Sequence, residues 1–477
     1  MNRVSAVLVK GITRIGPRWL PFADAATPEL PLGRILRLSL FQIAVGMATV
    51  LLVGTLNRVM IVELDVPAWL VAAMVSLPFL FAPFRALVGY KSDTHRSVLG
   101  WRRVPYIWFG SLMQFGGLAI MPFALLVLSG GGVGPVVYGQ IGAALAFLLV
   151  GAGLHTTQTA GLALATDLAT PATRARVVAL LYMTLLVGMV ASGLIFAWLL
   201  ADFSPLRLIQ VVQGAAVATM ALNIVALWKQ EVRNPARTAV DVERPAFRAM
   251  FAEFVARPRA QRFLVAVALG TCAFNMQDII LEPYGAQILK FSVASTTLLT
   301  ALLATGSFAA FTLAARAMVG GIDPYRLAAI GLVAGVVAFP CVIFAGALDS
   351  PGIFRVGTLM IGFGGGLFSV SMLTIAMELE NGARNGLAVG IWGAVQASAA
   401  GIAIALGGGI KDIFTALSES GALGAAFADP STAYNVVYHL EILLLFATLI
   451  AIGPLVRSAY PLRAPPSNRF GLAEFPS

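Results

Sequence analysis

Two carboxylates in an otherwise apolar stretch are the residues of this sequence most able to do chemistry. Asp278 and Glu282 lie within AFNMQDIILEPYGAQIL, residues 273–289, directly after an uninterrupted apolar run. Because they are four residues apart, they are expected on one helical face, one acid a turn above the other. A carboxylate inside a bilayer costs at least ~2.5 kcal/mol, so such groups usually face a bundle interior and mark a functional site. Alternatively, both acids lie in headgroup water at the outer end of the helix.

Polar neighbours extend this candidate site. Asn275 and Gln277 precede the acids along the chain and add two amide side chains. Pro283 follows Glu282. Because proline disrupts a helix that has already begun, we expect the helix to end just after the acidic face. The predicted site is therefore a group of two amides and two carboxyls near one end of a membrane span.

A histidine inside another apolar run is a second candidate. The sequence contains three histidines, and His155 is the one within the fourth run. Neutral imidazole is a common metal ligand, so His155 is a candidate axial ligand for a porphyrin-type metal. The alternative is a hydrogen bond from the ring to a neighbouring hydroxyl or carbonyl. His439 and Glu441, near the start of the last run, are weaker candidates, and the two cysteines form no CxxC motif.

Composition identifies the class of protein that must position these residues. The chain is 59% hydrophobic and 11% charged, unlike water-soluble domains. Apolar runs of about 20 residues occur about twelve times, which predicts an all-α polytopic membrane protein with twelve transmembrane helices. Of the 32 Lys and Arg residues, 27 fall on one side of these runs and 5 on the other. By the positive-inside rule both termini are cytoplasmic, and the net charge of +10 reflects topology rather than nucleic-acid binding.

The same pattern divides the chain into five regions. A basic, proline-containing stretch separates two sets of six apolar runs, and a charged segment with helical apolar spacing precedes the first. The predicted regions are a cytoplasmic amphipathic segment (1–35), a six-helix bundle (36–228), a basic cytoplasmic linker (229–261), a second six-helix bundle (262–456) and a cytoplasmic tail (457–477).

The two halves resemble each other internally, as expected of a two-bundle transporter fold. An acid followed by a short turn and an arginine closes the fourth run, as Asp167 and Arg174, and the tenth, as Glu378 and Arg384. This repeat predicts coupling residues at equivalent points of both halves.

The first and seventh runs also end in similar polar residues. Asn57-Arg58 aligns with Gln277-Asp278, and Glu63 aligns with Glu282. If the halves face each other through these helices, the Arg58 cation would neutralise Asp278 across the interface.

A short basic hairpin follows the second run. Gly89 lies four residues before Asp93, and Arg102 and Arg103 follow in the same hairpin. The glycine would permit close helix approach, Asp93 would cap a helix or pair with a basic neighbour, and the arginines would anchor the loop at the interface. This arrangement resembles the loop between helices two and three of major facilitator transporters.

Three motifs resemble a more specific family. They are LNRVMIVEL (56–64), YKSDTHRSVLGWRRVPY (90–106) and QDIILEPYG (277–285). All three are similar to the bacteriochlorophyll delivery branch of the major facilitator superfamily, the PucC and LhaA proteins of purple phototrophic bacteria, with LhaA the more similar. The resemblance implies two pseudo-symmetric six-helix bundles in the bacterial inner (intracytoplasmic) membrane and no enzymatic activity.

The resemblance also implies a cargo and partners. Such a protein would be an assembly chaperone that binds bacteriochlorophyll and delivers it to the α and β polypeptides of the core antenna around the reaction centre. Carotenoid and lipid are further candidate ligands, and bacteriochlorophyll synthase and the insertion machinery are further candidate partners. His155 or Glu282 would then bind the pigment magnesium, with Asp278, Gln277 and Asn275 beside it.

Other functions stay open on the residues alone. A proton-coupled transporter of a small solute or tetrapyrrole would use Asp278 and Glu282 as protonation sites. A scaffold without pigment would act through its lipid-facing spans and the basic linker. Within the family that the chain resembles, an assembly factor of the peripheral antenna is a further alternative.

Overall fold

The computed structural model describes most of the apolar chain and part of its loops. The described residues are 26–80, 85, 88, 91–92, 95, 100–131, 135–170, 173–232, 256–378, 385–424 and 427–457. The predicted amphipathic segment therefore lies outside the described residues up to residue 25, as do most of the predicted linker and tail. All regular structure in the described ranges is helical.

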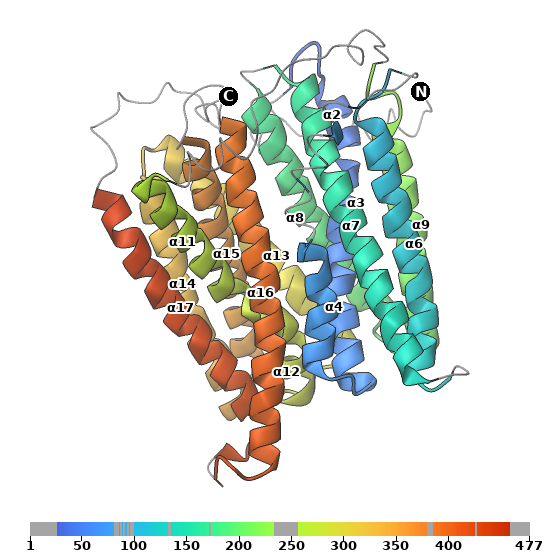
Figure 1. The fold of residues 1–477 in the computed structure, drawn as a ribbon, viewed down its shortest axis with the longest axis vertical. Helices are drawn as coiled ribbons and strands as arrows, with labels where there is room; N and C mark the ends of the chain where they lie inside the picture. The colour runs from blue at the N-terminus through green and yellow to red at the C-terminus, as the bar shows by residue number, and fades with distance from the viewer. Residues whose placement is uncertain are drawn as a thin grey trace.

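The first half of the chain forms one group of helices, coloured blue to green in Figure 1. Its first span begins as α-helix and continues in the wider π form. The elements are α2 (Leu32–Leu38), α3 (Leu40–Thr49), η2 (Val50–Leu56), η3 (Val59–Glu63), α4 (Ala68–Leu80), α6 (Val104–Leu128), α7 (Val136–Leu168), α8 (Arg174–Leu199) and α9 (Pro205–Leu227).

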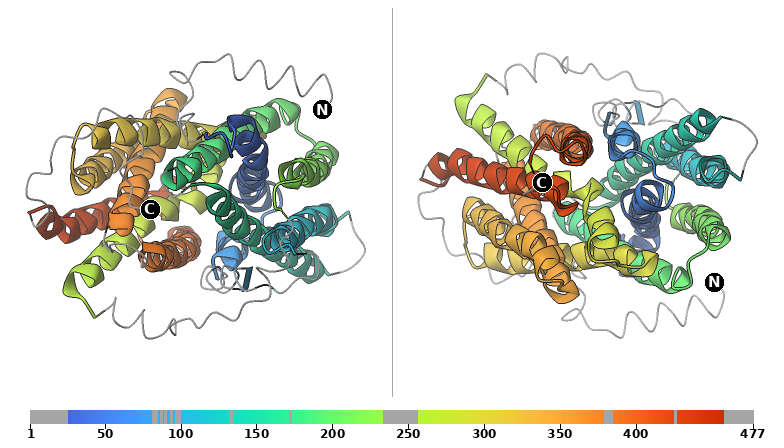
Figure 2. Two further views of the ribbon diagram at one scale, coloured as in Figure 1. Left: turned by 90° about the horizontal axis from the view of Figure 1, so that it is seen from above. Right: turned by 90° about the horizontal axis from the view of Figure 1, so that it is seen from below.

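The second half forms the other group, coloured yellow-green to red. Its first span is interrupted by a short 3-10 turn. The elements are α11 (Pro258–Asn275), η5 (Met276–Ile279), α12 (Leu281–Gln287), α13 (Val293–Val319), α14 (Pro324–Ala347), α15 (Pro351–Glu378), α16 (Asn385–Glu419) and α17 (Ser431–Arg457). Figure 2 shows the two groups side by side in views from above and below.

The helices have the length and surface of membrane spans. Eleven are long and apolar enough to cross a membrane, and α4 is a shorter apolar helix between the first two of them. Large apolar side chains such as Phe123, Trp198 and Ile450 are more than half exposed on outward faces. Polar side chains, in contrast, are found fully buried between helices. The predicted fold of twelve transmembrane helices in two bundles is confirmed, and the chain is a multi-pass membrane protein.

The most extensive contacts between the two groups come from four helices. Helix α8 packs on α13, and α4 packs on α16. At the second contact a Cβ on Gly408 would lie 2.4 Å from the Cβ of Ala72, so only glycine fits there. Helix α2 begins and α17 ends at the same end of the molecule, the upper end in Figure 1, which we call the near end. The opposite end, where α12 lies, is the far end.

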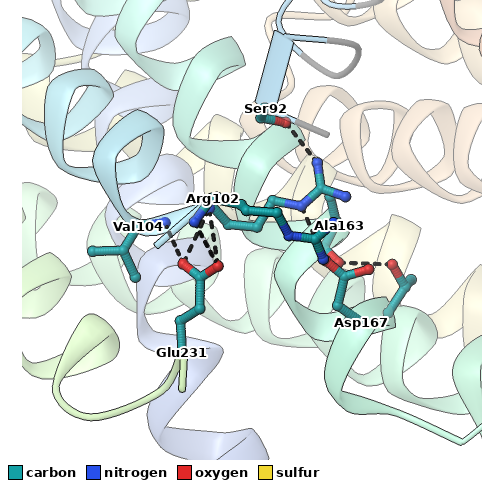
Figure 3. A network of polar contacts seen from close by, with 8 residues as sticks. Ser92, Arg102, Val104, Ala163, Asp167 and Glu231 are labelled. Carbon is teal, nitrogen blue, oxygen red and sulfur yellow. Dashed lines mark hydrogen bonds and ion pairs between the residues drawn. The ribbon is translucent and has the colours of Figure 1, made fainter. Parts of the chain in front are cut away.

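A carboxylate from beyond α9 caps the near end of α6 (Figure 3). Glu231 accepts hydrogen bonds from the backbone N–H groups of Arg102, Arg103 and Val104 at 2.8, 3.0 and 2.9 Å. The first N–H groups of a helix have no partner within the helix, and a negative charge there also favours the helix dipole. Glu231 therefore caps α6, and Asp93, for which the sequence predicted a cap or a basic partner, lies outside the described residues.

The same arginines connect the hairpin to α7. Arg103 donates from Nε to Asp167 at 3.0 Å and from Nη1 to Ser92 Oγ at 2.6 Å, and Arg102 Nη2 lies 3.4 Å from Asp167. Two motifs that the sequence presented separately, the basic hairpin and the acid that closes the fourth span, thus meet at the near end (Figure 3).

The cap predicts a measurable stability contribution. Glu231→Ala should lower the free energy of unfolding by about 1–2 kcal/mol, because three backbone N–H groups lose their acceptor. Thermal unfolding in mild detergent measures the change. Glu29→Ala is the matched control, since Glu29 is exposed and its side chain has no hydrogen bond or ion pair in the described ranges. Equal stability of the two variants would contradict the assignment.

Candidate functional site

The candidate site surrounds a break in the seventh span. Helix α11 ends at Asn275, and α12 begins at Leu281. Between them, the carbonyl oxygens of Asp278 and Ile279 each accept a hydrogen bond from the Asn57 side-chain amide at 3.1 Å. Asn57 is fully buried and comes from the junction of η2 and η3. The first span thus satisfies backbone groups at the break in the seventh.

Pro283 lies inside the helix it was expected to end. It is the third residue of α12, whose first residue is Leu281. The expectation was wrong because the N–H groups of a first helical turn have no helical acceptor, so a proline costs no hydrogen bond there. The break instead precedes Glu282, so Asp278 and Glu282 do not lie one turn apart on a continuous helix.

A glutamate from the last span holds the other side of the break. The Gln277 backbone N–H donates to Glu441 Oε1 at 2.7 Å. Gln277 and Glu441 are 1% and 0% exposed. Glu441 was only a weak candidate in the sequence, because its partner is a backbone group more than 160 residues away. An acceptor at this point replaces the carbonyl that a continuous helix would offer.

Glu282 points into a tight space between the first and eighth spans. Its Oε1 accepts a hydrogen bond from Thr300 of α13 at 2.6 Å, and its side chain is buried. A Cβ on Gly54 would lie 2.6 Å from both Glu282 Oε1 and Thr300 Oγ1. The missing side chain at Gly54 therefore makes room for this hydrogen bond, and no space for a large ring remains on that side of the carboxylate.

Asp278 and the two predicted amides have local contacts. The Gln277 side-chain amide donates to Asp278, which is half-buried. The same amide donates to the Phe274 carbonyl at 3.2 Å. Asn275 donates to the Thr271 carbonyl at 2.7 Å, one turn earlier in α11. Asn275 therefore closes the end of α11 rather than facing the acids.

Arg58 has a different partner from the one expected. Its Nη1 lies 2.5 Å from Glu63 Oε1, and the predicted pair with Asp278 is wrong in the part of the chain that is described. The π-helical turn η3 explains the change, because it brings residues five apart in sequence onto one side of the helix. The α-helical spacing assumed for the sequence would not align them.

Several buried polar atoms of this cluster have no partner among the described residues. They are Asn57 Oδ1, Gln277 Oε1, Glu282 Oε2 and Glu441 Oε2. Buried polar atoms are nearly always hydrogen-bonded, and unpaired ones mark a place for a proton, a water or a ligand donor. All four are acceptors, so the cluster can accept protons or hydrogen-bond donors.

His155 lies outside this cluster, in the first bundle. Its half-buried ring packs edge-on against Phe79 of α4, with 6.0 Å between ring centroids. No hydrogen bond to its ring is found among the described residues, so the expected alternative, a hydroxyl or carbonyl partner, is absent there. The imidazole can therefore bind a metal through a ring nitrogen without breaking a hydrogen bond to a described residue.

The structure adds a cation, Arg85, that the sequence motifs did not single out. Arg85 donates from Nε to Thr159 Oγ1 at 3.3 Å and from Nη2 to Gln158 Oε1 at 3.1 Å. Gln158 and Thr159 lie three and four residues after His155 on α7, so the three side chains share a face. The three- and four-residue spacing from His155 is the feature of the sequence that could have predicted this second cluster.

The remaining predicted coupling residues receive no structural test. Arg174 begins α8 and Glu378 ends α15, as the internal repeat suggests. Gly89, Asp93 and Arg384 lie outside the described residues. Their coupling roles stay predictions.

The packing around Glu282 predicts opposite effects for two glycine substitutions. Gly54→Ala should destabilise the protein by about 1–3 kcal/mol, because its Cβ overlaps the Glu282–Thr300 hydrogen bond. Gly116→Ala is the control, since a Cβ on Gly116 meets nothing within 4 Å. It should leave stability unchanged or raise it by up to about 1 kcal/mol, as alanine favours helix. Thermal unfolding compares them, and similar losses in both would refute the packing argument.

The Arg58 pairing predicts the outcome of two double-mutant cycles. Arg58→Ala with Glu63→Ala should show a coupling of about 0.5–1 kcal/mol, modest because Glu63 is 38% exposed. Arg58→Ala with Asp278→Ala should be additive within about 0.5 kcal/mol. Unfolding free energies in detergent measure both. The reverse ranking of the two couplings would restore the pairing expected from the sequence.

Known structures share this fold at low sequence identity. A bacterial homologue of the human lysosomal transporter Spinster aligns with a TM-score of 0.65 and 14% identity, covering 90% of this chain and 98% of that chain. The nucleoside transporter NupG aligns with a TM-score of 0.64 and 14% identity, covering 88% and 98%. The fold is that of the major facilitator superfamily, and at this identity the likeness extends to the fold alone.

Closer relatives come from purple bacteria. Protein PucC of Rhodovulum sulfidophilum is 55% identical over 86% of this chain and 92% of its own length. Protein PucC of Cereibacter sphaeroides is 52% identical over 97% and 100%. A Rhodobacter capsulatus protein described as an uncharacterized protein in the puhA-bchM intergenic region is 51% identical over 96% and 97%. The profile of the PUCC protein family matches residues 55–460, and the chain belongs to the PUCC family.

Proposed function

We propose that this protein is an assembly factor for light-harvesting complexes that binds bacteriochlorophyll and delivers it to the antenna α and β polypeptides. It would act as a carrier and chaperone, not as an enzyme. The proposal rests on membership of the PUCC family and on the resemblance of three sequence motifs to the bacteriochlorophyll delivery branch. The major facilitator fold supports it, since such folds bind their cargo between spans.

The observation that carries the pigment part of the proposal is the free imidazole of His155. Magnesium in a tetrapyrrole takes an additional oxygen or imidazole ligand, and a neutral ring nitrogen without a hydrogen bond can supply it. Phe79, edge-on to His155, offers an apolar aromatic surface beside the ring. The chain itself would therefore bind, orient and shield the pigment.

Glu282 fits this role less well than the sequence suggested. Its carboxylate is 3% exposed, and one of its oxygens is held by Thr300. The close approach of Gly54 leaves no room for a flat macrocycle there. Of the predicted ligands, His155 is therefore the one we assign to the pigment magnesium.

The proposed membrane orientation follows from charge. Arg102 and Arg103 precede α6 and Lys229 follows α9 at the near end, whereas at the far end Arg207 lies in the first turn of α9 and Lys290 lies between α12 and α13. By the positive-inside rule the near end faces the cytoplasm of a bacterial inner membrane. Antenna polypeptides and the reaction centre would meet the exposed apolar faces of the spans. The core antenna is the first assignment of this proposal, and the peripheral antenna is its alternative.

Pigment carried by the purified protein tests the proposal. Wild-type protein from pigment-making cells, extracted in mild detergent, should carry bacteriochlorophyll visible in its absorption spectrum and retain antenna polypeptides in a pull-down. His155→Ala should lose most of the pigment, because the magnesium loses its ligand. His95→Ala is the matched control, since His95 contacts Tyr106 in the near-end hairpin and should keep the pigment. Loss in both variants, or in neither, would argue against His155.

Two other outcomes would redirect the assignment. Colourless wild-type protein that still holds antenna polypeptides would indicate a scaffold without pigment. Colourless protein without partners would favour a transporter.

A proton-coupled transporter is the second candidate function. The specific observation in its favour is the buried acceptor cluster, in which Glu282 and Glu441 each leave one oxygen unpaired. Buried carboxylates in a membrane commonly belong to proton pathways. Proton-dependent uptake of a tetrapyrrole or small solute into vesicles, lost in Glu282→Gln, would support this function. Uptake that does not depend on the proton gradient would exclude a proton-coupled transporter.

A further inference from the structure

Arg85 is a charged side chain inside the first bundle that no function above uses. It is helical, half-buried and directed onto α7, where it contacts Gln158 and Thr159. Charged groups inside a membrane bundle are costly and usually serve a binding or coupling role. No carboxylate lies within ion-pair distance of Arg85 among the described residues. The charge is therefore not neutralised by this part of the chain.

The guanidinium also has spare hydrogen-bond donors. An arginine carries five N–H groups, and contacts of Arg85 account for one on Nε and one on Nη2. The other three donate to no described residue. Nη1, which carries two of these three N–H groups, is not among the buried atoms without a partner. A planar guanidinium with unused donors is the arrangement that binds carboxylate or phosphate oxygens.

Neighbouring side chains add to the same site. Gln42 of α3 is 0% exposed, its Oε1 accepts from Gln158 at 3.5 Å, and its Nε2 has no partner among the described residues. Tyr182 of α8 lies close enough to Arg85 to interact with it electrostatically. A buried amide donor without a partner, next to a cation without an anion, indicates a missing acceptor group.

We propose that Arg85, Gln158 and Gln42 form a binding site for an oxyanion group carried by a membrane amphiphile. The oxyanion is a carboxylate or a phosphate, and the apolar body of the ligand lies along the bundle. Two sources supply this chemistry. One is a magnesium tetrapyrrole with a free carboxylic acid, and the other is an anionic phospholipid.

The position of His155 links the site to the tetrapyrrole source. His155 precedes Gln158 by less than one helical turn, and Gln158 Oε1 accepts a hydrogen bond from Arg85. A tetrapyrrole bound through its magnesium at His155 could thus present a side-chain carboxylate to Arg85. This source rests on the proposed pigment binding, whereas the lipid source does not. The protein would then bind the free acid of a magnesium tetrapyrrole more tightly than its ester.

Binding titrations with matched ligands test the site. Wild-type protein in mild detergent is titrated, by absorption, with a magnesium tetrapyrrole free acid and with its methyl ester. Retention of phosphatidylglycerol is followed in parallel by native mass spectrometry. Wild-type protein should bind the acid about ten-fold more tightly than the ester, because a charge-assisted pair contributes at least that factor. Arg85→Gln should remove the difference in affinity between acid and ester. Arg85→Lys keeps the charge but not the planar guanidinium, so it should retain part of that difference.

Controls separate the site from general effects. Arg207→Gln removes one cation at the far end and should change neither ligand's affinity. If Arg85→Gln does not fold, Arg85→Lys and Gln158→Ala, which withdraws an acceptor that positions the guanidinium, carry the same test with smaller losses. Thermal unfolding verifies each variant.

Each outcome has one meaning. Preference for the acid that depends on Arg85 supports the tetrapyrrole source. Equal binding of acid and ester, with phosphatidylglycerol lost only in Arg85 variants, supports the lipid source and leaves pigment binding intact. Ligand binding that is independent of Arg85 in every arm overturns the site. Failure of wild-type protein to bind the ester at all counts against the proposed pigment function instead, and the lipid arm still decides the oxyanion site.

Discussion

The break in the seventh span is the constraint on which the rest of the far-end structure depends. In a bilayer, backbone groups that leave a helix must find partners within the protein. Asn57 supplies the donor for two carbonyls, and Glu441 supplies the acceptor for one N–H. The first, seventh and last spans are therefore held together by hydrogen bonds to the backbone, which cannot be exchanged for apolar packing without leaving those groups unpaired.

The polar groups of the protein are divided between two places with different chemistry. The far-end cluster around Glu282 presents unpaired acceptors between the two bundles. The cluster around Arg85 and His155 presents donors and a free imidazole within the first bundle. A single charged ligand would suit one of them and not the other. This separation is why the pigment assignment rests on His155 and the proton-coupled alternative rests on the acids.

The sequence predicted what depends on composition and local pattern. Span number, the two-bundle fold and the family follow from long apolar runs and contiguous motifs. Partners across the fold were harder to predict. Arg58 was assigned by α-helical register, and a π-helical turn shifted that register towards Glu63. Arg85 was not singled out, because its partners on α7 are more than 70 residues away in the sequence.

Residues 230 and 231, which follow α9, are hydrogen-bonded to the starts of two other helices of the first bundle. Gln230 accepts two hydrogen bonds from Arg34 at the start of the first span, at 3.2 and 2.6 Å, and Glu231 is fixed to the start of α6. The chain leaving the first bundle is thus clamped onto that bundle at two points. Tension transmitted along the linker would be borne by this clamp rather than by α9. The end of the first bundle is therefore attached to the helices of that same bundle. Cutting the chain after residue 231 would leave α9 attached to them.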